Sequence, residues 1–243
     1  AREAFMRSEA AAVQVPYLVI GLGVIGWAAV IVLTRFPPTD HIEEGAPAMR
    51  GVLGRLLRDG RLLGAVAAQF FYVGAQVGVW SYTIRYVQAT MPGTPAHAAA
   101  DFILAALVCF MAGRFVGTAL MRYLAPVRLL LAFAAINVAL TLYALLRPGM
   151  GGAWALVACS FFMSVMYPTI FALGVEGMDD DERKLGSALL VMTIIGGAVL
   201  TAAMGAVSDL AGIARALGVP ALSFAVVAWF AWRRLPRANG AAA

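Results

Sequence analysis

The side chains that could bind a small polar solute are concentrated in one apolar stretch, residues 62–87. Four of them, Gln69, Tyr72, Gln76 and Trp80, are spaced 3, 4 and 4 residues apart, so an α-helix would stack them on one face. Amides and a tyrosyl hydroxyl can hydrogen-bond the hydroxyl groups of a solute, and aromatic rings can pack against its C–H faces. One interpretation is therefore a cavity wall. The other is hydrogen bonding between helices, worth about 0.6 kcal/mol per contact, and the spacing alone does not choose between them.

A second polar face is predicted within residues 154–175. Ser160, Ser164 and Tyr167 follow one another at spacings of 4 and 3, and we expect Pro168–Thr169 to interrupt the helix after them. An isolated polar group that faces hydrocarbon costs several kcal/mol, so two polar helix faces in an apolar bundle indicate a surface that does not face lipid. Small hydroxyl residues are common where helices pack, and packing is the favoured interpretation of this second face.

One arginine, Arg114, lies well inside the apolar stretch 101–121. Placing an arginine at the centre of a membrane helix costs at least about 2.5–3.5 kcal/mol on insertion scales, so we expect Arg114 to face the protein interior or water. Contact with substrate or a gate and a purely structural tether both remain open. The neighbouring Gly113 and Gly117 form a small-xxx-small step that predicts close approach of another helix.

Several isolated polar residues in other apolar stretches have weaker predictions. Asn137 and Thr193 are expected to make packing contacts between helices, although Thr193 is kept with Arg114 and Ser164 as a candidate gating or cavity residue.

The sequence contains no pattern of residues that indicates catalysis. Both histidines, His41 and His97, lie in polar connectors, and there is neither an HExxH motif nor a nucleophile elbow. The one lysine, Lys184, also lies in a connector, which excludes a retinal protein with a Schiff base in its last helix. We therefore expect no enzyme, no catalytic residue, and no residue that binds a cofactor or a metal.

The elements that must position these residues are membrane-spanning helices. The chain is 62% hydrophobic and 13% charged, against about 45–50% apolar and about 25% charged residues in soluble domains. About 20 apolar residues in a helix cross a bilayer. Seven stretches of that kind predict an all-α, polytopic membrane helical bundle with spans at residues 16–36, 62–87, 101–121, 127–146, 154–175, 186–210 and 219–232.

The longest connector, residues 37–61, contains a short amphipathic pattern. Val52, Leu53, Leu56 and Leu57 alternate with arginines in its second half. This arrangement predicts a short helix that lies at the membrane surface.

The distribution of basic residues predicts the orientation. Of the 18 Lys and Arg residues, 12 lie in one set of connectors, 4 in the alternate set and 2 within spans. The richer side is expected to be cytoplasmic, which places the C-terminus inside and the chain start outside the cytoplasmic membrane. Because the basic residues are spread over loops, the net charge of +5 does not indicate a nucleic-acid partner.

Specific motifs resemble one family. Residues 68–86 (AQFFYVGAQVGVWSYTIRY) look like the seventh helix of the L-fucose–proton symporter family of the major facilitator superfamily. Three further segments resemble the same family in order along the chain: 113–118 (GRFVGT), 162–174 (FMSVMYPTIFALG), and 191–197 (VMTIIGG) followed by 204–209 (MGAVSD).

The resemblance implies a domain organisation. Residues 1–36 would be the remnant of an N-terminal bundle with one transmembrane helix at 16–36, and residues 37–61 would be the central cytoplasmic loop. Residues 62–243 would form the C-terminal six-helix bundle of a twelve-helix transporter. The expected partners are then the missing N-terminal six-helix half, the lipid bilayer and a monosaccharide.

The resemblance also implies a site. In this superfamily the first helix of each three-helix repeat lines the central cavity, and here those helices are the two with polar faces. Substrate-binding roles are thus expected for Gln69, Tyr72, Gln76, Trp80 and Tyr167.

The implied function is secondary active transport of L-fucose or a related monosaccharide with protons. The coupling carboxylates of the family lie in the N-terminal half, in helices that this chain does not contain. The alternative is a transport-inactive half-bundle that acts as a membrane binding or sensor protein, or as a partner-dependent subunit. Helices with intramembrane carboxylates encoded upstream of Ala1 would favour the transporter.

Overall fold

The computed structural model describes the backbone of residues 2–34 and 46–235, and the side chains of residues 18–34 and 51–235. All regular elements in these ranges are helices. The chain divides into two compact units, residues 1–45 and 46–243, and each is described by itself.

Among its described residues, 2–34, the first unit contains one helix, α1 (Arg2–Leu33). Its described part, Leu18–Leu33, is apolar, and its large hydrophobic side chains are exposed. The predicted span at 16–36 is therefore helical as far as residue 33, and its last two residues lie outside the described part of the chain.

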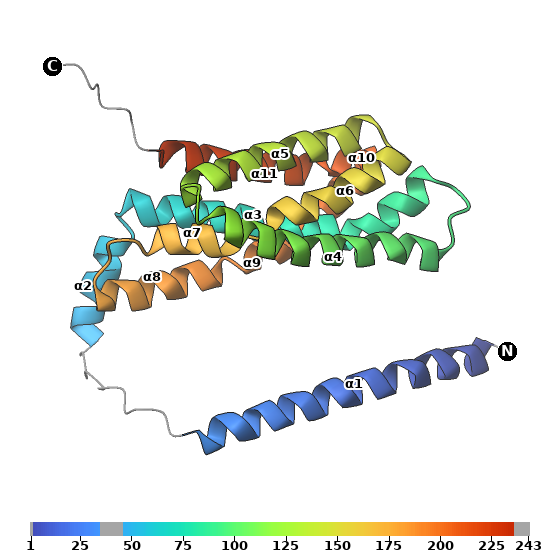
Figure 1. Ribbon diagram of the computed structural model, residues 1–243, viewed down its shortest axis with the longest axis horizontal. Coiled ribbons are helices and arrows are strands. Elements are labelled where there is room, and N and C mark those ends of the chain that lie inside the picture. The colour runs from blue at the N-terminus through green and yellow to red at the C-terminus, as the bar shows by residue number, and fades with distance from the viewer. Residues whose placement is uncertain (1, 35–45, 236–243) are drawn as a thin grey trace. The chain divides into compact units, whose positions relative to one another are not determined.

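The described part of the second unit, residues 46–235, contains six helical segments that are long and apolar enough to cross a membrane (Figure 1). Three are continuous helices: α3 (Gly60–Thr90), α4 (Ala96–Leu120) and α5 (Pro126–Leu146). The other three are each broken into two pieces: α6 (Met150–Met163) with α7 (Met166–Gly174), α8 (Asp180–Met192) with α9 (Ile195–Ala211), and α10 (Ile213–Ala216) with α11 (Gly218–Arg233). The six spans predicted after residue 61 are thus confirmed as helices.

The short helix predicted in the long connector is confirmed as α2 (Ala46–Leu56). Val52 and Leu56 are buried in the core, whereas Leu53 and Leu57 are exposed. Helix α2 packs against α8, and the two helices share an ion pair in which Arg55 Nε lies 3.4 Å from Glu182 Oε1. Its position at a membrane surface stays a prediction.

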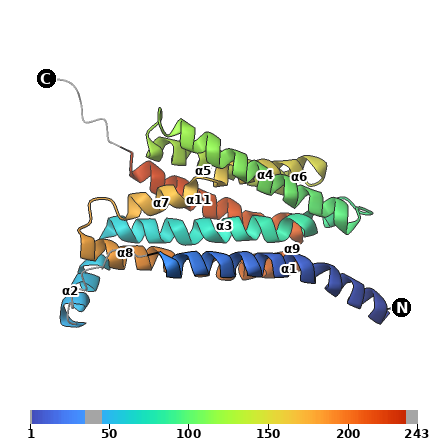
Figure 2. The same cartoon turned by 60° about the horizontal axis from the view of Figure 1, so that its bottom comes forward.

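Helix α3 is the central element of the second unit. It packs against α11, α9, α7 and α4, and Figure 2 shows it between α11 and α9. More of α3 is buried than of α4. In the apolar stretch of α3, 56% of the residues are buried, against 17% in that of α4. The side chains that α3 presents therefore point mainly into the protein, as a helix with a polar face in an apolar bundle requires.

Two glycine contacts bring helices close together. A Cβ on Gly113 of α4 would collide with the backbone oxygen of Phe161 on α6, and a Cβ on Gly196 of α9 would collide with the backbone oxygen of Phe70 on α3. The close approach predicted at Gly113 and Gly117 is confirmed, because a Cβ on Gly117 would collide with the side chain of Val165.

The break in the fifth predicted span lies earlier than expected. The sequence predicts an interruption at Pro168–Thr169, but the helix stops at Met163 and resumes at Met166. Proline has no N–H and its ring clashes with the carbonyl four residues earlier, so the distortion falls one turn before the proline, at Ser164. Pro168 itself continues α7.

Candidate functional site

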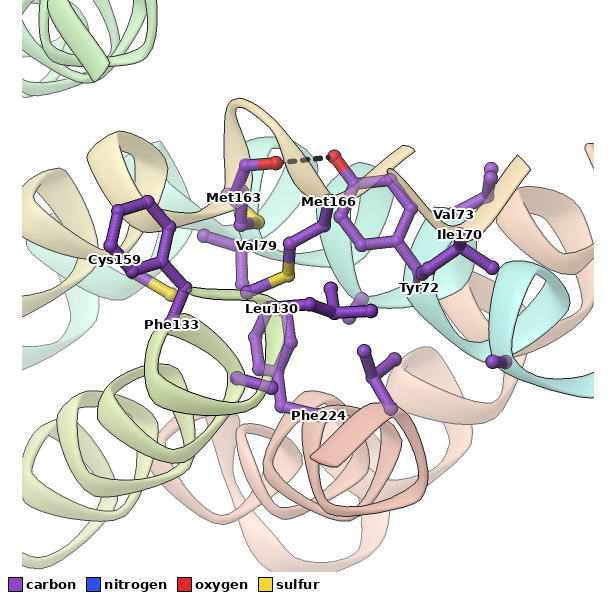
Figure 3. Close-up of a cluster of buried hydrophobic side chains, with 14 of the residues drawn as sticks. Tyr72, Val73, Val79, Leu130, Phe133, Cys159, Met163, Met166, Ile170 and Phe224 are labelled. Carbon is purple, nitrogen blue, oxygen red and sulfur yellow. Dashed lines mark hydrogen bonds between the residues drawn. The ribbon is translucent and has the colours of Figure 1, made fainter. Parts of the chain in front are cut away.

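The predicted polar face of α3 points toward α6 and α7. The Tyr72 hydroxyl donates a hydrogen bond of 2.9 Å to the backbone oxygen of Met163, and Figure 3 shows this bond beside the apolar core. The Tyr72 ring meets the Tyr167 ring edge to face, with 6.3 Å between centroids. Tyr72 is fully buried, and the bond to Met163 already uses the one hydrogen that its hydroxyl can donate.

About two helical turns beyond Tyr72 on the same face, Trp80 connects three helices. Its indole Nε1 donates to Ser160 Oγ of α6 at 3.1 Å. Its ring packs edge to face on Phe110 of α4, with centroids 5.2 Å apart. Trp80 is half-buried, which leaves part of the indole face free to contact another molecule.

Tyr167 extends the aromatic row along α7. Its ring stacks on Phe171 with centroids 6.4 Å apart and 16° between the planes. With Tyr72 this makes a continuous row of three rings, and Tyr167, like Trp80, is half-buried. Partly accessible aromatic faces of this kind suit the C–H face of a sugar ring.

The two glutamines of the face differ in environment. Gln69 is completely buried, and neither atom of its amide has a hydrogen-bond partner among the described residues. Gln76 is half-buried. A buried amide without a partner costs about 1–3 kcal/mol in mutational data, so Gln69 is a group that a bound molecule or water would satisfy.

Of the three candidate gating or cavity residues, Ser164 and Thr193 lie at helix breaks, and Arg114 reaches one of these breaks from the continuous helix α4. Arg114 Nη1 donates to the backbone oxygen of Ser164 at 2.9 Å, where α6 ends. The Ser164 hydroxyl donates to the backbone oxygen of Phe161 at 2.7 Å. Thr193 is buried at the α8–α9 break, and its hydroxyl donates to the backbone oxygen of Leu190. The structure thus pairs Arg114 with Ser164, while Thr193 bonds only within its own helix.

A cavity of about 550 Å³ opens beside this pair. Its lining includes Arg114 and Thr118 of α4 and Pro168 and Thr169 of α7. Glu176, which follows α7, lines the same cavity. The cavity therefore has a cation and a carboxylate in its lining.

Sequence reasoning missed partners that are not marked by side-chain patterns. The sequence analysis predicts no role for Phe110 or Phe171, which complete the aromatic contacts of Trp80 and Tyr167. Asn137 on α5, for which a packing contact between helices is predicted, is fully buried, and its amide is unpaired among the described residues. In the described part of the chain there is also no cluster of three or more His, Cys, Asp and Glu residues that could hold a metal ion.

The proteins of known function that are similar to this chain are sugar transporters. No family model matches the chain. The L-fucose-proton symporter of Escherichia coli (strain K12) is 44% identical over 232 residues, which are 94% of this chain and 53% of that protein. A glucose/galactose transporter of Brucella abortus is 31% identical over 233 residues, 95% of this chain and 55% of that protein.

Solved structures agree with these relatives. The crystal structure of FucP, a major facilitator superfamily transporter, in the outward conformation superposes with a TM-score of 0.82 at 44% identity. It matches 92% of this chain and 55% of that structure. The chain is therefore similar to L-fucose-proton symporters, and its fold is that of half of a major facilitator superfamily transporter. The match covers the C-terminal half of these relatives, so the chain spans about half of their length.

This relationship agrees with the fold as described. The chain is a multi-pass membrane protein, and the relatives that it matches are transporters. The roles of the individual site residues stay predictions.

Proposed function

We propose that the chain provides the C-terminal half of the transport path of a secondary active transporter that moves a monosaccharide together with protons. The observation that carries the proposal is 44% identity to an L-fucose-proton symporter over 94% of the chain. The polar faces of α3 and of α6–α7, which pack on one another through Tyr72 and Trp80, support it independently.

The proposed sugar site lies on the α3 and α7 side chains that remain partly accessible. Trp80 and Tyr167 would stack on the sugar ring, and Gln76 would bond its hydroxyls. Tyr72 holds the two helices together through Met163, and its ring supports that of Tyr167. Gln69 would contribute its unpaired amide when the helices shift. The substrate is L-fucose or a related monosaccharide, because the relatives include both fucose and glucose/galactose transporters.

Movement would occur at the broken helices. Alternating access in transporters of this kind is rocking of two helix bundles about a site near the midplane. The breaks at Ser164 and at Thr193 are points where α6–α7 and α8–α9 lack continuous backbone hydrogen bonding and can bend. Arg114 would then act as a gating residue by holding the first break in one geometry.

Coupling and location complete the proposal. The coupling ion is a proton, and the carboxylates that exchange it would belong to the N-terminal helices of the transporter. The protein would lie in the cytoplasmic membrane with its C-terminus inside, as the distribution of Lys and Arg predicts.

A second candidate function is a transport-inactive half-bundle that binds a sugar or depends on a partner chain. One observation favours it: the amide of Gln69 is fully buried and has no hydrogen-bond partner among the described residues, so this bundle has a polar group of its own that a bound sugar could satisfy. A sugar would then bind to this half without being moved.

Uptake of radiolabelled L-fucose into proteoliposomes under an imposed pH gradient tests both functions. The assay uses the chain alone and the gene product that contains it. Trp80→Ala, Gln76→Ala and Tyr167→Ala should each reduce uptake at least about tenfold, the effect of losing about 1.4 kcal/mol of binding. Trp154→Ala is the matched control, because Trp154 also packs edge to face on a phenylalanine but is exposed on α6.

The outcomes separate the hypotheses. Uptake that requires the pH gradient supports the symporter, whereas saturable sugar binding without uptake in any preparation supports the half-bundle. If uptake occurs but the three alanine variants behave like Trp154→Ala, the site is wrong. If no sugar is bound or carried, both functions are rejected.

A further inference from the structure

A second cavity, of about 630 Å³, lies at one end of the helical bundle of residues 46–243, where α3 begins and α11 ends. It is separate from the proposed sugar site, because none of its residues belongs to the polar face of α3. Its lining includes Arg61, Gly64, Trp229, Phe230, Arg233 and Arg234.

The local backbone explains why this space exists. Asp59 caps α3, and its carboxylate accepts a hydrogen bond of 2.8 Å from the backbone N–H of Arg61. The first turns of α3 carry Gly60 and Gly64, which have no side chains to fill the space beside α11. At Gly64, an added Cβ would lie 3.5 Å from the Phe230 ring, so the glycine keeps the cavity open against that ring.

The charge of the lining is strongly positive. Three guanidinium groups face it, against the one carboxylate of Asp59. Arg234 is already engaged, since it donates to the backbone oxygens of Arg61 and Leu173 at 3.2 Å and lies 4.0 Å from Glu176. Arg61 and Arg233 take part in no ion pair within the described residues. Two cations are therefore available to an anion.

The engaged arginine remains charged. Partial burial lowers the pKa of Arg234 from its ordinary value, whereas the nearby Glu176 raises it. A guanidinium stays protonated in proteins, so Arg234 adds a fixed positive charge to the cavity.

Aromatic side chains hold two of the three arginines at this end of α11. The Arg233 guanidinium lies 5.1 Å from the centroid of the Trp229 ring, and Arg234 lies 5.4 Å from that of Phe230. A guanidinium stacked on an aromatic face keeps its N–H groups free at the ring edge, where they can bond two oxygens. Trp229 and Trp232 are exposed at this end of a membrane-length helix, the depth at which tryptophan and arginine meet lipid headgroups.

We propose that this cavity binds the phosphodiester headgroup of an anionic phospholipid, with Arg61 and Arg233 as its ligands. A phosphate oxygen pair matches the planar fork of a guanidinium. The exposed indoles of Trp229 and Trp232 offer apolar surface for the acyl chains, which a soluble phosphate lacks. Basic pockets between helices at a membrane interface bind anionic headgroups by this chemistry.

Native mass spectrometry of the whole chain in detergent tests the proposal by titration with phosphatidylglycerol and, separately, phosphatidylcholine. The double variant Arg61→Gln/Arg233→Gln should weaken phosphatidylglycerol binding by about fivefold for each arginine removed, and should leave phosphatidylcholine binding unchanged. The matched control is Arg122→Gln/Arg128→Gln. These two exposed arginines lie outside the cavity in the connector between α4 and α5 and at the start of α5, and their replacement should change affinity less than twofold.

Trp229→Leu provides an independent variant that keeps all charges and removes the stacking surface of Arg233. It should weaken phosphatidylglycerol binding two- to fivefold, as expected for the loss of a cation–π contact. The proposal is overturned if both Arg61→Gln/Arg233→Gln and Trp229→Leu bind phosphatidylglycerol as the unmodified chain does, or if the control weakens binding equally. Displacement of the lipid by inorganic phosphate at equal concentration would also overturn it, because the site would then select a free anion.

Discussion

Arg114 and Ser164 are joined across two helices: the guanidinium of Arg114 on α4 donates a 2.9 Å hydrogen bond to the backbone carbonyl of Ser164 at the end of α6. Pro168 follows Ser164 by four residues and has no N–H, so the usual helical donor to this carbonyl is missing. Arg114 supplies a donor in its place. The charged Arg114 within one apolar span therefore satisfies the carbonyl that Pro168 leaves without a donor in another span.

Replacing Arg114 should destabilise the bundle. Arg114→Ala leaves the Ser164 carbonyl without this donor, and a hydrogen bond to a charged group contributes about 1.5–3 kcal/mol. Because the Arg114 side chain is partly exposed, we expect the lower end of that range, and an apparent melting temperature in detergent that falls by about 3–6 °C. The control is Arg122→Ala, at an exposed position in a connector. Equal melting temperatures for both variants would reject the role of Arg114.

The proline and the arginine should be energetically coupled. Pro168→Ala restores an N–H that can donate to the Ser164 carbonyl, which makes Arg114 less necessary. A double-mutant cycle of Pro168→Ala and Arg114→Ala should give an interaction energy of about 1 kcal/mol, with the smaller arginine effect in the alanine background. Thermal unfolding of the four proteins measures it. Additive effects would show that the two residues act independently.

The sequence predicts most of the fold because the bilayer fixes the length of each element. Apolar runs of about 20 residues mark all six helical segments after residue 61. Spacing on one helix face also predicts that Tyr72 and Trp80 point toward other helices, as their bonds to Met163 and Ser160 confirm.

What the sequence does not reveal depends on backbone atoms and on burial. The acceptors for Tyr72 and Arg114 are backbone carbonyls, which every residue has, so no side-chain pattern marks them. The complete burial of Gln69 without a partner depends on how α3 is rotated in the bundle, and residue spacing gives only relative positions on one face. Whether the face binds sugar stays a prediction.

Glycine-to-alanine changes should lower the melting temperature where the glycine lies against the backbone of another helix, and should leave it unchanged where there is room for a methyl group. Gly196→Ala places a Cβ against the backbone oxygen of Phe70, which belongs to the central helix and cannot move as a side chain can. Overpacking of this kind costs about 1–3 kcal/mol, so the melting temperature should fall by several degrees. Gly218→Ala is the control, since its nearest neighbour would be a leucine methyl at 3.7 Å. Unchanged stability of Gly196→Ala would mean that α3 and α9 are not in close contact.

The buried side chains of Gln69 and Asn137 give a test that separates an effect on protein stability from an effect on sugar binding. Gln69 and Asn137 are both fully buried and both unpaired among the described residues, but only Gln69 lies on the proposed sugar-binding face. Replacing an unpaired buried amide by an apolar residue of similar size removes a desolvation penalty. Gln69→Leu and Asn137→Leu should therefore each stabilise the sugar-free protein by about 1 kcal/mol, measured as a higher melting temperature.

The two variants should differ in their affinity for sugar. Gln69→Leu removes an amide that the sugar would satisfy, and the affinity for L-fucose in isothermal titration should fall about tenfold. Asn137→Leu should leave that affinity unchanged, because α5 contributes no residue to the proposed site. A gain of stability in both variants with no loss of affinity in either would assign Gln69 to packing alone. Loss of affinity in both would instead move the sugar site toward α5, because a buried polar group that costs stability is retained where it serves binding.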